Sequence, residues 1–88
     1  MNTDNTRAQM RKGLLEYCIM LLLKQRACYA NDIIEQLSKT DMIVMEGTLY
    51  PLLNRLKKDG ILKYEWQESK TGPPRKYYTL TPQGHQVL

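Results

Sequence analysis

The strongest hydrophobic pattern in the chain lies in residues 46–60, where leucines recur at helical spacing. The apolar positions follow the i, i+3, i+4, i+7 spacing of one helical face and are Leu49, Leu52, Leu53 and Leu56. Pro51 lacks a backbone N–H and is tolerated only in a first turn, so the helix should begin near Gly47 or Thr48. Gly60 can adopt the left-handed conformation that ends a helix. Taken alone, this pattern is typical of an ordinary amphipathic helix with a solvated basic face.

A longer apolar pattern over residues 7–25 predicts a first helix. Its main stripe consists of Met10, Leu14, Tyr17, Cys18, Leu21 and Leu22, and it is widened by Leu15, Ile19 and Leu23. A helix that is apolar over so much of its circumference must be covered on more than one side. A partner subunit would provide that cover; the alternative is the central helix of a small bundle. We expect residues 1–6 to be frayed and flexible, with Asp4 or Thr6 as the N-cap.

The rest of the chain predicts one more helix, a β-hairpin and the start of a last helix. Residues 30–39 have a short helical pattern, and after Gly60 the apolar period changes to that of a strand. We expect a turn over residues 69–74, because glycine and two prolines interrupt the hydrogen-bond ladder between strands. A second strand should follow over residues 75–80. Thr81 and Pro82 then have the N-cap and first-turn signature of a helix.

The order of these elements predicts an α+β fold, a winged helix-turn-helix, in which three helices precede a two-stranded hairpin. In this arrangement the third helix enters the DNA major groove, and the hairpin, or wing, contacts the flanking backbone. The exposed side of the third helix carries Thr48, Tyr50, Asn54, Arg55, Lys57 and Lys58. The wing tip carries Lys70, Arg75 and Lys76. We therefore expect the helix to read base edges and the wing cations to contact phosphates.

Length and composition limit the functional classes. The 88 residues form a single domain, and the formal net charge of +4 is compatible with a phosphate-bearing partner. Cys18 and Cys28 form neither a disulfide framework nor a zinc motif, which indicates the reducing cytoplasm. No signal peptide is visible, and the apolar run at residues 19–23 is too short to span a membrane. No catalytic, cofactor or metal motif is present, so we expect neither an enzyme nor a cofactor.

A few residues have both a structural and a functional interpretation. We expect Trp66 to anchor the wing on the core, as an isolated hairpin is unstable in water; effector stacking is the alternative. Tyr50 lies off the leucine stripe, which favours a DNA contact over a core position. Cys18 and Cys28 are expected to be buried structural thiols, with a redox switch as the alternative.

Several separated motifs together resemble the PadR family of bacterial transcriptional repressors. They are GTLYPLLNRLKKDG at residues 47–60, Trp66, GPPRKYYTLTPQG at residues 72–84, and KGLLEYCIMLLL at residues 12–23. The resemblance implies a homodimeric repressor that binds an inverted-repeat operator in double-stranded DNA. It also implies release by a small-molecule effector or a stress signal, as in many members. Dimerisation would use the first helix and a C-terminal helix, of which residues 82–88 are the start.

The resemblance also implies roles for individual residues. Tyr50, Asn54 and Arg55 match the DNA-reading face, and Gly72, Pro73, Arg75 and Lys76 match the wing tip. Tyr77, Tyr78, Leu80 and Thr81 match the structural end of the wing, whereas Ala30 replaces a glycine that is frequent in the family. The predicted DNA-binding residues are Thr48, Tyr50, Asn54, Arg55, Lys58, Lys70, Gly72, Arg75 and Lys76. The alternative from another class is a winged-helix module for protein–protein contact, but such modules usually lose the basic wing and recognition face.

Overall fold

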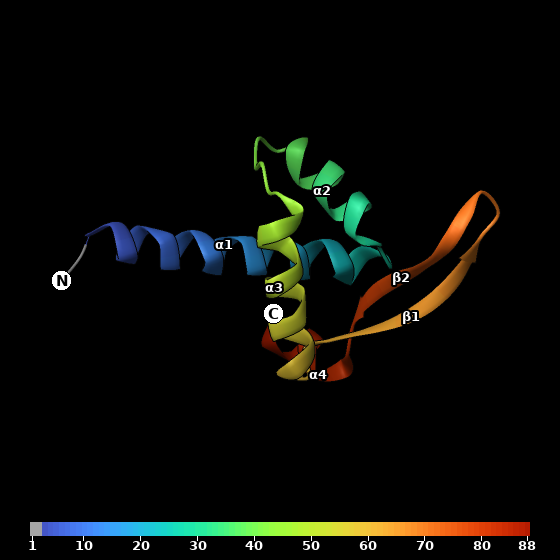
Figure 1. The fold of residues 1–88 in the computed structure, drawn as a ribbon. Helices are drawn as coiled ribbons and strands as arrows, with labels where there is room; N and C mark the ends of the chain where they lie inside the picture. The colour runs from blue at the N-terminus through green and yellow to red at the C-terminus, as the bar shows by residue number, and fades with distance from the viewer. Residues whose placement is uncertain (1–2) are drawn as a thin grey trace.

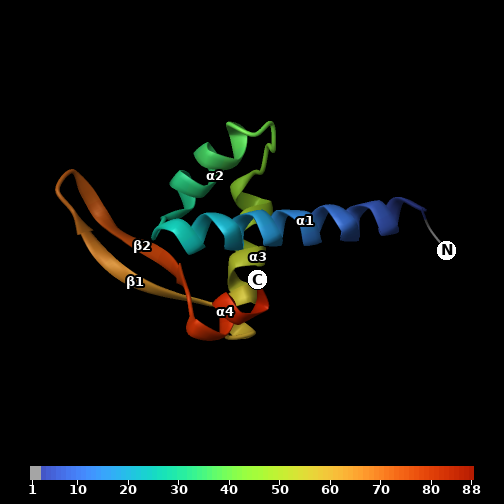
Figure 2. The ribbon, with the colours of Figure 1, turned by 180° about the vertical axis from the view of Figure 1, so that it is seen from behind.

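The computed structural model describes residues 3–88, which form the predicted sequence of helices and strands. The elements are α1 (Thr3–Gln25), α2 (Ala30–Ser38), α3 (Glu46–Lys58), β1 (Leu62–Ser69), β2 (Gly72–Leu80) and α4 (Pro82–Val87). Figure 1 shows α3 crossing α1, while the hairpin of β1 and β2 projects away from the helical body. Seen from behind in Figure 2, the hairpin and the N-terminal half of α1 extend in opposite directions.

The core forms where α1, α2 and α3 meet the base of the hairpin. All four leucines of the predicted α3 stripe are buried, and the side chain of Leu53 is fully enclosed. The other elements contribute Leu15, Ile19, Met20, Leu23, Ile33, Leu37, Leu62, Tyr78 and Leu80. The helical period in residues 46–60 therefore identified the buried face of α3 correctly.

Helix α1 begins at Thr3, four residues before the predicted start. Asp4 and Thr6, which were expected as N-cap candidates, lie inside the helix, so that expectation was wrong. Asp4 stands in the first turn, where its carboxylate is favourable beside the positive end of the helix dipole. Residues 1–2 lie outside the described part of the chain.

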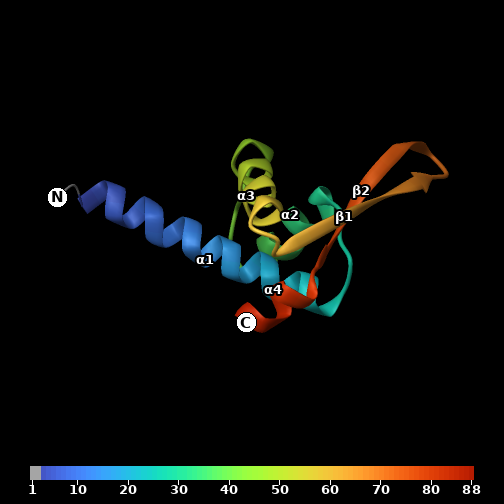
Figure 3. The ribbon, with the colours of Figure 1, turned by 90° about the horizontal axis from the view of Figure 1, so that it is seen from below.

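The apolar stripe predicted for α1 is largely exposed in the single chain. Its exposed members are Met10 (70%), Leu14 (54%), Tyr17 (53%) and Leu21 (38%). The buried side of α1 is instead formed by Leu15, Ile19, Met20 and Leu23. The helix thus packs on its own domain with one face and presents a second apolar face outward. Figure 3 shows the N-terminal half of α1 extending away from the other elements.

Helix α3 begins at Glu46, one or two residues before the predicted start at Gly47 or Thr48, so Pro51 stands inside the helix and not in its first turn. The first helical bonds run from the N–H groups of Thr48 and Leu49 to the carbonyl of Met45. Pro51 has no N–H to donate to the carbonyl of Gly47. Both Gly47 and Pro51 are exposed, so water can replace that missing bond.

The hairpin is longer than predicted, because residues 72–74 belong to β2 and not to the turn. Ser69 pairs with Gly72, and the next pair towards the base is Gln67 with Arg75. The register shifts between these pairs, and the two prolines lie at this irregular point, where a missing N–H costs least. At the other end, Cys28 and Tyr78 exchange backbone hydrogen bonds of 3.2 and 2.8 Å, which tie the segment before α2 to β2.

A tight corner joins α3, β1 and α4. Gly60 ends α3 with a φ of 77°, as its left-handed role predicted. Thr81 caps α4 by accepting the N–H of Gly84 at 2.9 Å, and its own N–H donates to the carbonyl of Ile61 at 3.0 Å. The predicted N-cap at Thr81 and first-turn proline at Pro82 are therefore confirmed.

Candidate nucleic-acid interface

The exposed face of α3 carries Tyr50, Asn54 and Lys58, spaced four residues apart. The buried leucines occupy the opposite side of the helix, so these three side chains project away from the core. Tyr50 keeps 43% of its surface exposed, in agreement with its position off the leucine stripe. A hydroxyl, an amide and an ammonium group on one accessible face can form hydrogen bonds with base edges or phosphates.

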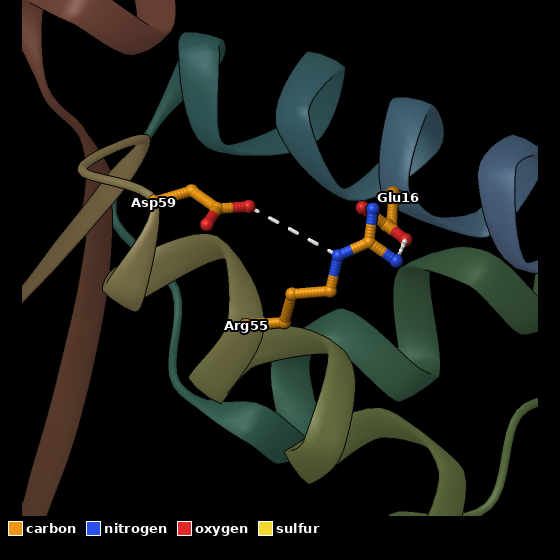
Figure 4. A network of polar contacts seen from close by, with 3 residues as sticks. All are labelled: Glu16, Arg55 and Asp59. Atoms are coloured by element: carbon orange, nitrogen blue, oxygen red, sulfur yellow. Dashed lines mark ion pairs between the residues drawn. The ribbon is translucent and has the colours of Figure 1, made fainter.

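Arg55 lies on a different edge of α3, which faces α1. Its Nη1 is 3.1 Å from Oε1 of Glu16 in α1, and its Nε is 4.0 Å from Oδ2 of Asp59, the residue that follows α3. Figure 4 shows the guanidinium between these two carboxylates. Thr48, seven residues before Arg55, follows the same edge and is exposed. The structure thus separates Arg55 and Thr48 from the row of Tyr50, Asn54 and Lys58.

The two principal wing cations rest on tyrosine rings. The guanidinium of Arg75 lies 4.5 Å from the ring centroid of Tyr29, which in turn packs on Tyr77 at 5.4 Å. The ammonium of Lys76 lies 4.6 Å from the ring of Tyr64 and 5.2 Å from that of Trp66. Such cation–π contacts restrict long side chains before any ligand is present.

The tip of the wing is exposed, and two further predicted residues stand there. Lys70 lies in the connection between the strands, and Gly72 opens β2. Both are exposed, and Figure 1 shows the tip as the part of the hairpin farthest from the helices. Lys70 is therefore free of the helical body, unlike Arg75, which contacts Tyr29.

Trp66 does not anchor the wing on the core, so that prediction was wrong. It is 60% exposed and makes an edge contact with Tyr64 at 6.3 Å between ring centroids. Along the same face of β1, Leu62 is buried, Tyr64 is half-buried and Trp66 is exposed. The alternation of the strand continues at Trp66, but burial decreases along this face towards the wing tip.

A groove of about 360 Å³ lies between the start of α2, the first turns of α3 and the wing. Residues that line it from these three elements include Asn31, Tyr50, Trp66, Arg75 and Lys76. Tyr29 also lines the groove and supports Arg75. Neither Tyr29 nor Asn31 was predicted to bind DNA, because no periodic pattern links the start of α2 to strand β2, which begins more than forty residues later.

The charge of this groove is uneven. Arg75 and Lys76 place positive charge on its wing side, and Glu46 places a carboxylate at the start of α3. Burial raises the pKa of Tyr78 above its usual value, and the neighbouring Tyr50 and Tyr64 hydroxyls add to this effect. Tyr78 is therefore a neutral hydroxyl at physiological pH, and the positive character of the groove comes from the wing.

The two cysteines are unpaired and differ in environment. Cys28 is fully buried, as predicted, whereas Cys18 is only partly buried. Burial raises the pKa of the Cys28 thiol. This effect outweighs the opposing effect of Arg26, so the thiol is protonated at neutral pH.

Residues 3–88 contain no group of three or more histidine, cysteine, aspartate or glutamate side chains arranged to hold a metal ion. Within the same residues, no helix has the length and apolar character needed to cross a membrane.

A comparison with protein families gives a match to the "Transcriptional regulator PadR-like family" over residues 19–88. Among curated proteins, the chain is 43% identical over 54 residues to "Transcriptional regulator Rv3488" of Mycobacterium tuberculosis, covering 61% of this chain and 50% of that protein. It is also 27% identical over 85 residues to an uncharacterized protein of Lysinibacillus sphaericus, with 93% of this chain and 78% of the other covered.

Solved structures extend the comparison to the fold. A PadR-like transcription factor from Bacteroides fragilis is 61% identical, with a TM-score of 0.86 over 94% of this chain and 81% of that one. Bacillus subtilis PadR in complex with operator DNA is 27% identical, with a TM-score of 0.75 over 84% of this chain and 44% of that one. These likenesses confirm the predicted winged-helix fold. The matched family is one of transcription regulators, which agrees with the expectation that the chain is not an enzyme.

Proposed function

The chain belongs to the PadR-like family of transcriptional regulators, and from this premise we propose that it is a repressor that binds an inverted-repeat operator as a homodimer. The observation that carries the proposal is the exposed row of Tyr50, Asn54 and Lys58 beside a wing whose cations are held on tyrosine rings. In this proposal the row on α3 reads bases, and the wing binds phosphates on the flanking backbone.

The wing supports this division of roles by its geometry. Arg75 and Lys76 are oriented by Tyr29, Tyr64 and Trp66, so less side-chain freedom is lost when a phosphate binds. A cation at this position contributes by releasing counterions from DNA, which strengthens binding to every sequence. Sequence preference must then come from α3, whose amide and hydroxyl groups can distinguish one base edge from another.

The second apolar face of α1 supports the homodimer. Met10, Leu14, Tyr17 and Leu21 recur at helical spacing and are exposed in the single chain. A row of this kind is typical of a helix that pairs with a second copy. A two-fold dimer built on α1, extended by α4, would place its reading helices about 34–36 Å apart, one turn of B-DNA.

Two further parts of the proposal come from the family. We propose that a small-molecule effector or a stress signal lowers the affinity of the dimer for its operator. We also propose that the chain acts in the cytoplasm, where a bacterial operator is accessible. The competing function, a winged-helix module for protein contact, would need no affinity for DNA.

Selection from a pool of random duplexes tests the proposed function directly. The wild-type chain is expected to enrich one inverted-repeat sequence and to retard it at moderate salt, where a scrambled duplex of equal composition migrates freely. Equal retardation of both duplexes at low salt, with none at moderate salt, would contradict sequence-specific binding. Absence of retardation even at low salt would favour the protein-contact module.

Sedimentation of single variants tests the dimer. Tyr17→Glu places a charge on the exposed apolar face of α1 and should convert the dimer into a monomer. Gln9→Glu adds the same charge at an exposed position of α1 that does not belong to that face, and it should leave the dimer intact. A wild-type chain that remains monomeric at tens of micromolar, an order-of-magnitude working concentration, would refute the homodimer.

A further inference from the structure

Two polar side chains of α1, Arg11 and Glu16, contact α3 and the segment that precedes it. Arg11 donates from Nη2 to the carbonyl of Ile43, at 3.0 Å, in the segment that leads into α3. Glu16 pairs with Arg55 in the second half of α3, at 3.1 Å. Between them, Leu15 is fully buried against the core. One short section of α1 therefore contacts both the approach to α3 and its body.

The pair of Glu16 and Arg55 is not an ordinary surface contact. Only 13% of the Glu16 side chain is exposed, against 62% for Arg55. A carboxylate that has lost most of its water needs a charged partner, and a guanidinium offers several donors in a fixed plane. Asp59 lies on the Nε side of the same guanidinium, so Arg55 is held from both α1 and the end of its own helix.

We propose that Arg55 is a positioning residue for DNA recognition, which together with Glu16 fixes the orientation of α3 on α1, and that it does not read a base. This inference rests on the proposed function, because it concerns how α3 is presented to an operator. It assigns base reading to the row of Tyr50 and Asn54, which projects away from the domain.

The ion pair of Glu16 and Arg55 lies next to the proposed dimer contact. The face of α1 that we propose for dimerisation includes Leu14 and Tyr17, and Tyr17 directly follows Glu16 in the sequence. The helix that sets the geometry of the dimer is thus the helix that holds Arg55. In the proposed dimer, the distance between the two α3 helices therefore depends both on the contact between the two α1 helices and on the ion pair that holds each α3 on its α1.

The variant Glu16→Gln distinguishes a positioning role of Arg55 from a base-reading role, because the two roles predict opposite changes in the affinity for DNA. If Arg55 read a base, this substitution would release it and also remove a negative charge, so DNA would bind more tightly. If Arg55 positions α3, the helix becomes free to adopt other orientations, and the apparent affinity falls with the competent fraction. We expect about a tenfold weaker binding of the duplex selected by the wild-type chain, which corresponds to about 1.4 kcal/mol.

Glu35→Gln is the matched control. Glu35 is an exposed carboxylate on α2, and its substitution changes the net charge by the same amount without touching the pair. It should leave the affinity unchanged or slightly raise it. Thermal unfolding of both variants shows whether each is folded at the assay temperature.

The double reversal Glu16→Arg with Arg55→Glu is an independent test of whether Arg55 positions α3 or reads a base. It also answers this question if Glu16→Gln does not fold. It restores an ion pair between α1 and α3 at the same net charge, so positioning predicts that binding recovers to within about threefold of wild type. Reading predicts the opposite, because a carboxylate on α3 would then face the DNA.

The outcomes distinguish this inference from the function on which it rests. A wild-type chain that enriches no sequence contradicts the proposed function. A wild-type chain that enriches a sequence, combined with a Glu16→Gln variant that binds it equally or more tightly, overturns the positioning role alone. Weaker binding by Glu16→Gln, unchanged binding by Glu35→Gln and recovery in the double reversal support it.

Discussion

The variant Gly84→Ala should destabilise the fold, although alanine is the better helix former. A Cβ at Gly84 would overlap the carbonyl oxygen of Ile61 and lie 3.1 Å from Cδ2 of Leu80. The carbonyl of Ile61 cannot easily withdraw, because it accepts the N–H of Thr81 at 3.0 Å. The Thr81 hydroxyl donates to the carbonyl of Gly60 at 2.6 Å and lies 3.1 Å from the carbonyl oxygen of Ile61. The corner that joins α3 to the wing therefore requires the absence of a side chain at this position.

The size of the effect follows from two opposing contributions. Overpacking a filled site costs about 1–3 kcal/mol, and weakening the hydrogen bond from the N–H of Thr81 to the carbonyl of Ile61 adds about 1 kcal/mol. The helix propensity of alanine returns up to about 1 kcal/mol. A net loss of about 2 kcal/mol remains, which lowers the melting temperature of a domain of this size by roughly 8–16 °C.

Gly47→Ala is the matched control for this prediction. Gly47 is also in a helix, has no positive φ, and an added Cβ there meets nothing within 4 Å. Its substitution should leave the stability unchanged or raise it by up to about 1 kcal/mol. Thermal and urea unfolding at one protein concentration compares the two. If Gly84→Ala unfolds at or above the wild-type temperature, the close approach of Gly84 to Ile61 is refuted.

Three further predictions concern the core, the wing and the pH dependence. Leu53→Ala should cost about 2–5 kcal/mol in urea unfolding, because Leu53 is fully buried; a variant as stable as wild type would mean that the wrong face of α3 has been assigned to the core. Trp66→Ala should cost less than about 1 kcal/mol, as expected for an exposed side chain, and a loss of 3 kcal/mol or more would restore Trp66 as a core anchor. Burial raises the pKa of both Cys28 and Tyr78, so at high pH the unfolded chain loses these protons first and stability falls. The urea midpoint should therefore decrease as the pH rises above the ordinary thiol value of 9.0, and a midpoint that increases there would contradict the burial of both groups.

The features that the sequence predicted correctly depend on contacts between near neighbours. The leucine period in α3, the cap at Thr81 and the left-handed Gly60 are each determined by residues within one or two turns. These local signals sufficed for the order of elements and hence for the fold. The motifs around them also sufficed for the family.

The features that the sequence missed depend on where one element ends relative to another. Alternation placed Trp66 on the same face of β1 as Leu62 and Tyr64, but only the structure shows that burial along this face decreases from Leu62 to an exposed Trp66. Arg55 is exposed and basic like Lys58, and nothing in the local sequence indicates that Glu16 stands opposite one of them. In α1, the sequence predicted one wide apolar surface, and only the structure shows which of its residues face the core and which face solvent.

The most direct test of the central claim compares Asn54→Ala with Arg75→Ala, titrated against the selected duplex and a scrambled one at several salt concentrations. Loss of Asn54 should cost about 1–3 kcal/mol on the selected duplex only, and relax the preference at one base position. Loss of Arg75 should weaken both duplexes alike and reduce the slope of log K against log salt by about 0.9. If Arg75→Ala abolishes the sequence preference while Asn54→Ala retains it, then the wing is the reader and α3 is not.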